Sequence, residues 1–102
     1  MLWAYYVDAF AKFKEGDGTL LDNMLIYAST DQSLARLHQI DGLPMFTAGK
    51  AGGLIKTGQY LNMANDPATR LGLTAMNVFK VPVSKFGTNS METSHPITEI
   101  MA

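Results

Sequence analysis

The residues in this sequence best suited to chemistry are two histidines, His38 and His95, and the carboxylates near them. His38 follows Asp31 by seven positions, in a polar stretch after an expected strand. Zinc and manganese accept imidazole and carboxylate ligands, and loops at strand ends often hold ligands. Asp31 and His38 are therefore candidate ligands of a divalent, zinc-like metal. The alternative is an ordinary surface loop, because a metal needs about three or four protein ligands.

The other reactive groups predict no catalytic or cofactor-binding residue. His95 has no carboxylate at a useful helical spacing, so we expect a solvated side chain. Ser29, Thr30 and Ser33 lie outside any G-x-S-x-G elbow, and hydroxyl-rich loops usually bond to their own backbone. The glycine-rich segment 49–53 lacks the spacing of a phosphate loop or a dinucleotide fingerprint. It predicts a tight turn between strands.

The first element that would position these residues is an amphipathic helix. Apolar residues at steps of three and four predict a helix over residues 2–14. Its stripe consists of Trp3, Tyr6, Val7, Phe10 and Phe13. We expect this stripe to pack its aromatic rings on a sheet. The segment 15–18, Glu-Gly-Asp-Gly, ends the helix because glycine and aspartate favour caps and turns.

Two strands and a second helix are expected further along the chain. Continuous apolar runs at 24–29 and 45–48 predict short strands, the first buried on both faces of a parallel sheet. Asp66 is a candidate helix cap, and Pro67 suits the first helical position because it lacks the N–H that would need a partner there. This helix is expected to end near Phe79, before a proline.

The expected fold class is α/β, with a small, mostly parallel sheet of two to four short strands flanked by two helices. The chain has 102 residues, which allows a single domain, expected over 1–87, with an irregular C-terminal tail over 88–102. The formal net charge of −1 argues against a nucleic-acid partner. No apolar run reaches the length of about 18 residues that a membrane span requires.

Several segments, taken in order, resemble the C-terminal part of a secreted bacterial family of uncharacterised proteins, domain-of-unknown-function family 1552. They are Glu15–Asn23, the strand ending at Ser29, Asp31, His38, Leu43–Pro44, Ala48–Gly49, Gly52–Gly58, Tyr60–Leu61, Pro67–Phe79, Val81–Val83 and Phe86–Gly87. The family is distantly similar to the alkaline phosphatase and sulfatase superfamily, whose α/β sheet carries Asp and His metal ligands on loops after its strands. The resemblance implies the C-terminal portion of such a fold, with Asp31 and His38 in a ligand loop.

The function expected from this resemblance is that of a C-terminal fragment or stand-alone remnant of a hydrolase-like protein, not catalytically complete by itself. Its partner would be the upstream part of a longer chain or a second copy, because a half-sheet exposes an edge and an apolar face. The alternative is a self-associating binding or assembly module without catalytic activity. A complete small enzyme is the least favoured reading.

Overall fold

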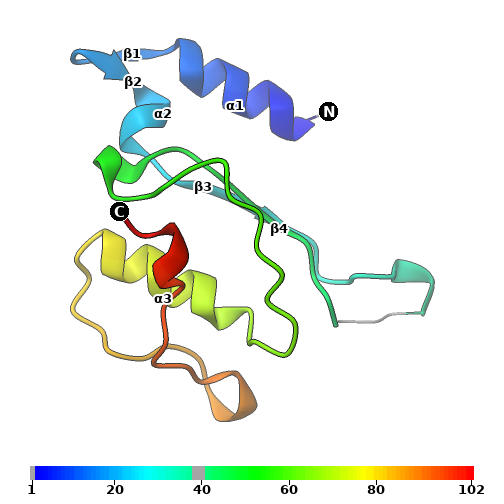
Figure 1. Ribbon diagram of the computed structural model, residues 1–102. Helices are drawn as coiled ribbons and strands as arrows, with labels where there is room; N and C mark the ends of the chain where they lie inside the picture. Colours follow the sequence, from blue (N-terminus) through cyan, green and yellow to red (C-terminus); the bar gives the residue numbers. More distant parts are fainter. Residues whose placement is uncertain (1, 38–40) are drawn as a thin grey trace.

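The computed structural model describes residues 2–37 and 41–102 and has the α/β class that the sequence predicts (Figure 1). The helices are α1 (Leu2–Lys12), α2 (Leu20–Asn23) and α3 (Thr69–Val78). The strands are β1 (Lys14–Glu15), β2 (Gly18–Thr19), β3 (Ile26–Ser29) and β4 (Met45–Ala48). Short 3-10 turns complete the described part: η1 (Ala35–Leu37), η2 (Ala51–Gly53), η3 (Asn89–Met91) and η4 (Thr98–Ile100).

The expected first helix is present as α1 and ends two residues early, at Lys12. The chain then reverses in a hairpin that the sequence did not predict, in which Lys14 pairs with Thr19. Gly16 occupies the left-handed region at the turn, with φ of 58°. Glycine enters this region without the steric cost that a Cβ atom brings. The glycines after the helix therefore act as a hairpin turn and lead directly into α2.

The predicted strands exist, but the expectation of a mostly parallel sheet is wrong. β3 and β4 are antiparallel, with Ile26 opposite Ala48 and Ser29 opposite Met45. A parallel pair needs a crossover that returns the chain to the starting end of the sheet, usually through a helix. The described part of the connection contains only the 3-10 turn η1. It therefore reverses the chain, as an antiparallel pair requires. In the described part of the chain, each of the two sheets has two strands.

The second predicted helix is present as α3, although its start differs from the expectation. Regular α-helix begins at Thr69, and the Asp66 carboxylate pairs with the Arg70 guanidinium at 2.8 Å. Asp66 thus bridges to the next turn of the helix. At the other end, the N–H of Lys80 donates to the Asn77 carbonyl (3.0 Å), and that of Val81 donates to the Met76 carbonyl (2.9 Å). These bonds form a Schellman cap with Lys80 in the left-handed conformation, at φ of 60°.

The buried core surrounds α3. Its hydrophobic members are Ala51, Ile55, Val78, Ile97 and Ile100, and Leu73 and Thr74 of α3 are also fully buried. Segment 88–102, which the sequence predicted as an irregular tail, consists of the turns η3 and η4 with connecting loops and is firmly packed. The Ile97 N–H donates to the Thr74 hydroxyl at 2.7 Å, and η4 lies against α3 (Figure 1). By contrast, no residue of α1 is buried.

The left-handed cap at Lys80 provides a test of the α3 terminus. Replacing Lys80 with glycine removes the Cβ strain and should raise the free energy of unfolding by about 0.5–1 kcal/mol, net of glycine's greater freedom in the unfolded chain. Urea unfolding followed by circular dichroism measures the change. Lys80→Ala is the matched control because it keeps a Cβ atom at this position. Equal stability of the two variants would contradict the assigned cap.

Candidate functional site

Of the two predicted metal ligands, only Asp31 belongs to the described residues. Asp31 lies in an exposed bend shortly after β3, whereas His38 lies outside the described residues. Across residues 2–37 and 41–102, no group of three or more potential ligand side chains could hold a metal ion. The pairing of Asp31 with His38 stays a prediction.

The hydroxyl groups near Asp31 interact with the backbone, as the sequence suggested. The Ser29 hydroxyl lies 3.1 Å from the carbonyl oxygens of Thr30 and Pro44. The Thr30 hydroxyl donates to the Gln32 carbonyl at 2.7 Å. Such bonds stabilise a strand end and the start of a loop. They give neither hydroxyl a base that could activate it as a nucleophile.

The glycine-rich segment 49–53 forms η2 and packs against α2 as a structural turn. The N–H groups of Lys50 and Ala51 donate to the Leu21 and Met24 carbonyls, at 3.2 and 3.0 Å. A Cβ atom on Gly49, whose φ is 103°, would lie 2.1 Å from the Met24 oxygen. Only glycine permits this close approach. Because these N–H groups already donate within the chain, they do not form a cradle for a phosphate.

The carboxylate of Asp22 has a lowered pKa because of the groups that surround it. Its Oδ2 accepts hydrogen bonds from the N–H and the hydroxyl of Thr19, both at 2.9 Å. Its Oδ1 lies 3.1 Å from the Lys50 ammonium. The Thr19 backbone N–H, followed by Lys50 and the Thr19 hydroxyl, lowers the pKa of Asp22 from 3.8 to about 2. The group joins the start of α2 to the loop before η2, which is a structural role.

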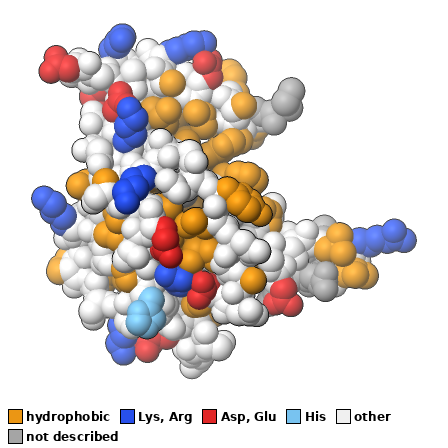
Figure 2. Space-filling view, in the orientation of Figure 1, with side chains coloured by type: hydrophobic (Ala, Val, Ile, Leu, Met, Phe, Trp, Pro, Cys, Tyr) orange, Lys and Arg blue, Asp and Glu red, His pale blue; other side chains and the backbone are white. Residues whose placement is uncertain are grey.

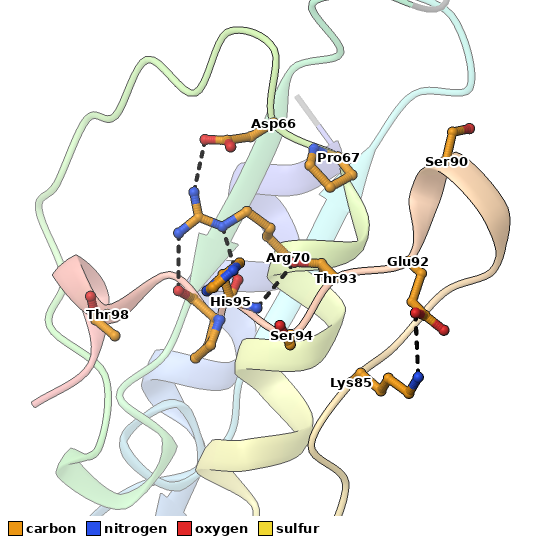
Figure 3. A pocket seen from close by; sticks show the side chains of 11 residues that line it. Asp66, Pro67, Arg70, Lys85, Ser90, Glu92, Thr93, Ser94, His95 and Thr98 are labelled. Atoms are coloured by element: carbon orange, nitrogen blue, oxygen red, sulfur yellow. Dashed lines mark hydrogen bonds and ion pairs between the residues drawn. The ribbon is translucent and has the colours of Figure 1, made fainter.

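A polar groove of about 830 Å³ lies between the start of α3 and the C-terminal segment (Figure 3). Arg70 donates to the Asp66 carboxylate and to the carbonyls of His95 and Pro96, at 2.8 to 3.0 Å. Its side chain is only 16% exposed. A second ion pair, Lys85 with Glu92 at 3.4 Å, lies on the other side of the groove. Both basic groups are paired, so the groove presents little net charge to a ligand.

The groove also contains His95, which the sequence predicted to be solvated. Its side chain is exposed, as expected. Two hydrogen bonds involve the backbone of His95: its carbonyl accepts from Arg70, and its N–H donates to the Thr93 hydroxyl. Arg70 therefore fastens the C-terminal segment to α3 through two backbone carbonyls. This is the arrangement of a structural clamp.

An apolar hollow of about 360 Å³ lies between α1 and β3. The name apolar hollow is kept for this cavity, which is lined by Leu2, Trp3, Tyr6, Phe10, Ile26, Tyr27 and Ala28. The rings of Tyr6 and Phe10 stack with centroids 6.5 Å apart. The predicted aromatic stripe thus faces a sheet, but it is not fully buried there. Tyr6 remains 47% exposed. Hydrophobic side chains gather along this side of the molecule (Figure 2).

The apolar surface continues from the hollow onto β4. Phe46 is directly opposite Ala28 in the antiparallel register and is therefore on the same face of the sheet. Its side chain is 56% exposed. Sequence reasoning missed Phe46 because its position depends on the strand pairing. Leu2 could have been recognised, since it precedes Tyr6 and Phe10 at steps of four along the helix.

Comparison with protein-family models, with curated proteins and with solved structures finds no match to this chain. Among the helices of the described segments, none combines the length and hydropathy needed to cross a bilayer. Function is therefore inferred from the geometry of the chain itself. The apolar hollow is the strongest candidate site because its lining lacks charged residues and two of its aromatic side chains, Tyr6 and Tyr27, remain exposed.

The shifted pKa of Asp22 predicts a pH-dependent contribution to stability. A folded-state pKa of about 2, below the ordinary 3.8, means that the folded state holds this proton more weakly than the unfolded chain. The contribution is present above about pH 4 and is lost as the pH falls through about 2. Asp22→Asn should reduce the fall of the urea midpoint across this range, whereas Asp17→Asn, in the β1–β2 turn, should leave it in place. Identical pH profiles for Asp22→Asn and the unmodified chain would contradict the role of Asp22.

Proposed function

We propose that this chain is a self-associating binding module in which a second copy covers the apolar hollow. The observation that carries the proposal is the aromatic stripe of α1, which is only partly covered. The helix has eleven residues, and none of them is buried. A helix of this length is marginal in water by itself and depends on packing of its apolar face. The β3–β4 ribbon supplies only part of that packing.

The exposed area of the chain supports a partner of substantial size. The solvent-accessible surface is 7404 Å², whereas a compact monomer of this mass exposes about 5,700 Å². The radius of gyration is 14.7 Å, compared with about 13 Å for a compact domain of this length. The excess surface is thus about 1,700 Å², and one partner in a standard interface buries about 800 Å². The excess is large enough for a stable dimer contact.

The chemistry of the hollow favours a second copy as the occupant. Its lining contains no charged side chain and is rich in Trp and Tyr, residue types that are enriched at interface centres. A twofold contact uses the same patch on both subunits and therefore needs a self-complementary apolar surface. The net charge of −1 opposes association of two copies only weakly.

A charge placed on the stripe should break the association. Tyr6→Lys keeps a good helix former at a half-exposed position. It should raise the dimer dissociation constant by about 30-fold, corresponding to about 2 kcal/mol for loss of an aromatic anchor. Sedimentation velocity over a concentration series measures the change. Tyr60→Lys is the matched control, because Tyr60 is 90% exposed and lies outside the hollow.

Two outcomes would contradict the proposal. The first is a monomeric unmodified chain at high micromolar concentration. The second is an equal effect of Tyr6→Lys and Tyr60→Lys, which would place the contact elsewhere. Circular dichroism of both variants checks that α1 remains helical, so that a change in association can be attributed to the surface.

A second candidate is the C-terminal portion of an alkaline phosphatase or sulfatase-type protein. Two features favour it besides the family resemblance: Asp31 lies two residues after the end of β3, and a two-stranded ribbon usually needs further strands for stability. In this candidate the upstream part of a longer chain would cover the hollow. Asp31 and His38 are donor types that suit zinc, but two ligands fall short of a complete site. This chain would then contribute ligands without catalysing a reaction by itself.

Zinc titration tests this second candidate. Calorimetry should detect weak binding, with a dissociation constant near the millimolar range, that is lost in both Asp31→Ala and His38→Ala. His95→Ala is the control because this histidine lies outside the predicted loop. Absence of heat at millimolar zinc, or binding that survives both substitutions, would contradict a metal role for this pair.

A further inference from the structure

The connection between β3 and β4 carries an apolar surface of its own. We call the two described segments of this connection, residues 30–37 and 41–44, the arm. Figure 1 shows these described segments projecting beyond the ends of β3 and β4, away from α3. Leu34 is 48% exposed and Leu37 is 64% exposed. Two exposed leucines on one short projection leave apolar surface in water, and burying that surface against a partner would stabilise the complex.

The local backbone holds these two leucines together. The Leu37 N–H donates to the Leu34 carbonyl at 3.0 Å, which closes the 3-10 turn η1. The bond places the two leucines at the two ends of a single tight turn, with Cα atoms within about 7 Å of each other. We call these two exposed residues, Leu34 and Leu37, the tip of the arm.

The arm cannot fill the hollow of its own subunit from this position. The lining of the hollow includes no arm residue, and the arm leaves the sheet at Ser29 and Met45, beyond the hollow's β3 residues. Figure 2 shows the surface recessed between α1 and the arm, with hydrophobic side chains along the recess. The arm and α1 thus lie on two sides of the same recess. A second copy can enter it.

We propose that two copies associate by reciprocal arm exchange, in which the Leu34–Leu37 tip of each enters the apolar hollow of the other. This inference rests on the proposed self-association and specifies its geometry. A twofold axis through the recess makes both contacts at once, since in an isologous interface each patch meets its counterpart on the partner. The hollow, at about 360 Å³, has room for aliphatic side chains beside Trp3 and Tyr6. Leucine packed against aromatic rings gains hydrophobic and dispersion energy.

The absence of cysteine from the chain allows a clean cross-linking test. Copies carrying Leu37→Cys are mixed with differently tagged copies carrying Ala28→Cys and treated with a short bis-maleimide. We expect the mixed cross-link to form at least tenfold faster than with Tyr60→Cys in place of Ala28→Cys. A separate Leu37→Ser variant should raise the dimer dissociation constant at least tenfold while leaving the helical circular dichroism signal unchanged.

The other outcomes distinguish this inference from the function on which it rests. Rapid cross-linking between two Tyr6→Cys copies, with none between Leu37→Cys and Ala28→Cys, would show that the α1 faces pack on each other. The arm exchange would then be wrong, and self-association would stand. An unmodified chain that stays monomeric in sedimentation velocity would overturn both the arm exchange and the proposed self-association.

Discussion

Burial of apolar surface is unevenly distributed along this chain, and that imbalance governs the rest of the structure. Ile55, Val78, Ile97 and Ile100 gather around α3 and form a small core. At the other end of the molecule, α1 has no buried residue although its stripe is aromatic. Hydrophobic stabilisation scales with apolar area removed from water, so α1 contributes little to the isolated fold. A partner that covers the stripe would supply the missing burial.

The junction between the two ends explains why the core does not extend to α1. It includes backbone hydrogen bonds from Lys50 to Leu21 of α2 and from Ala51 to Met24, the residue after α2, and the ion pair between Asp22 and Lys50. Gly49 allows the two backbones to approach closely. These polar, backbone-mediated contacts fix the position of α2 but bury little apolar surface. The hairpin, α1 and the β3–β4 ribbon are thereby held beside the core with one apolar side open.

Much of the secondary structure could be predicted from the sequence, because α1 and α3 have clear helical periodicity and both longer strands are distinct apolar runs. Strand direction could not, since a single run does not specify its partner. In β3, Tyr27 and Ser29 are exposed while Ile26 and Ala28 are half-buried, which is the alternation of an antiparallel strand with one covered face. The packing of segment 88–102 could not be predicted from the sequence either, because it depends on isolated residues without periodicity.

The candidate site was accessible to sequence reasoning only in part. The aromatic stripe could be seen in the spacing of α1, whereas the contribution of Phe46 depends on the strand register.

The most direct test of an aromatic face covered by a partner uses Trp3, the single tryptophan of the chain, which lines the hollow. Its fluorescence emission is recorded during dilution from high micromolar to nanomolar concentration. Our account predicts a red shift with a single concentration midpoint as the partner dissociates and water reaches the indole. An emission maximum that stays constant over the whole range would contradict it.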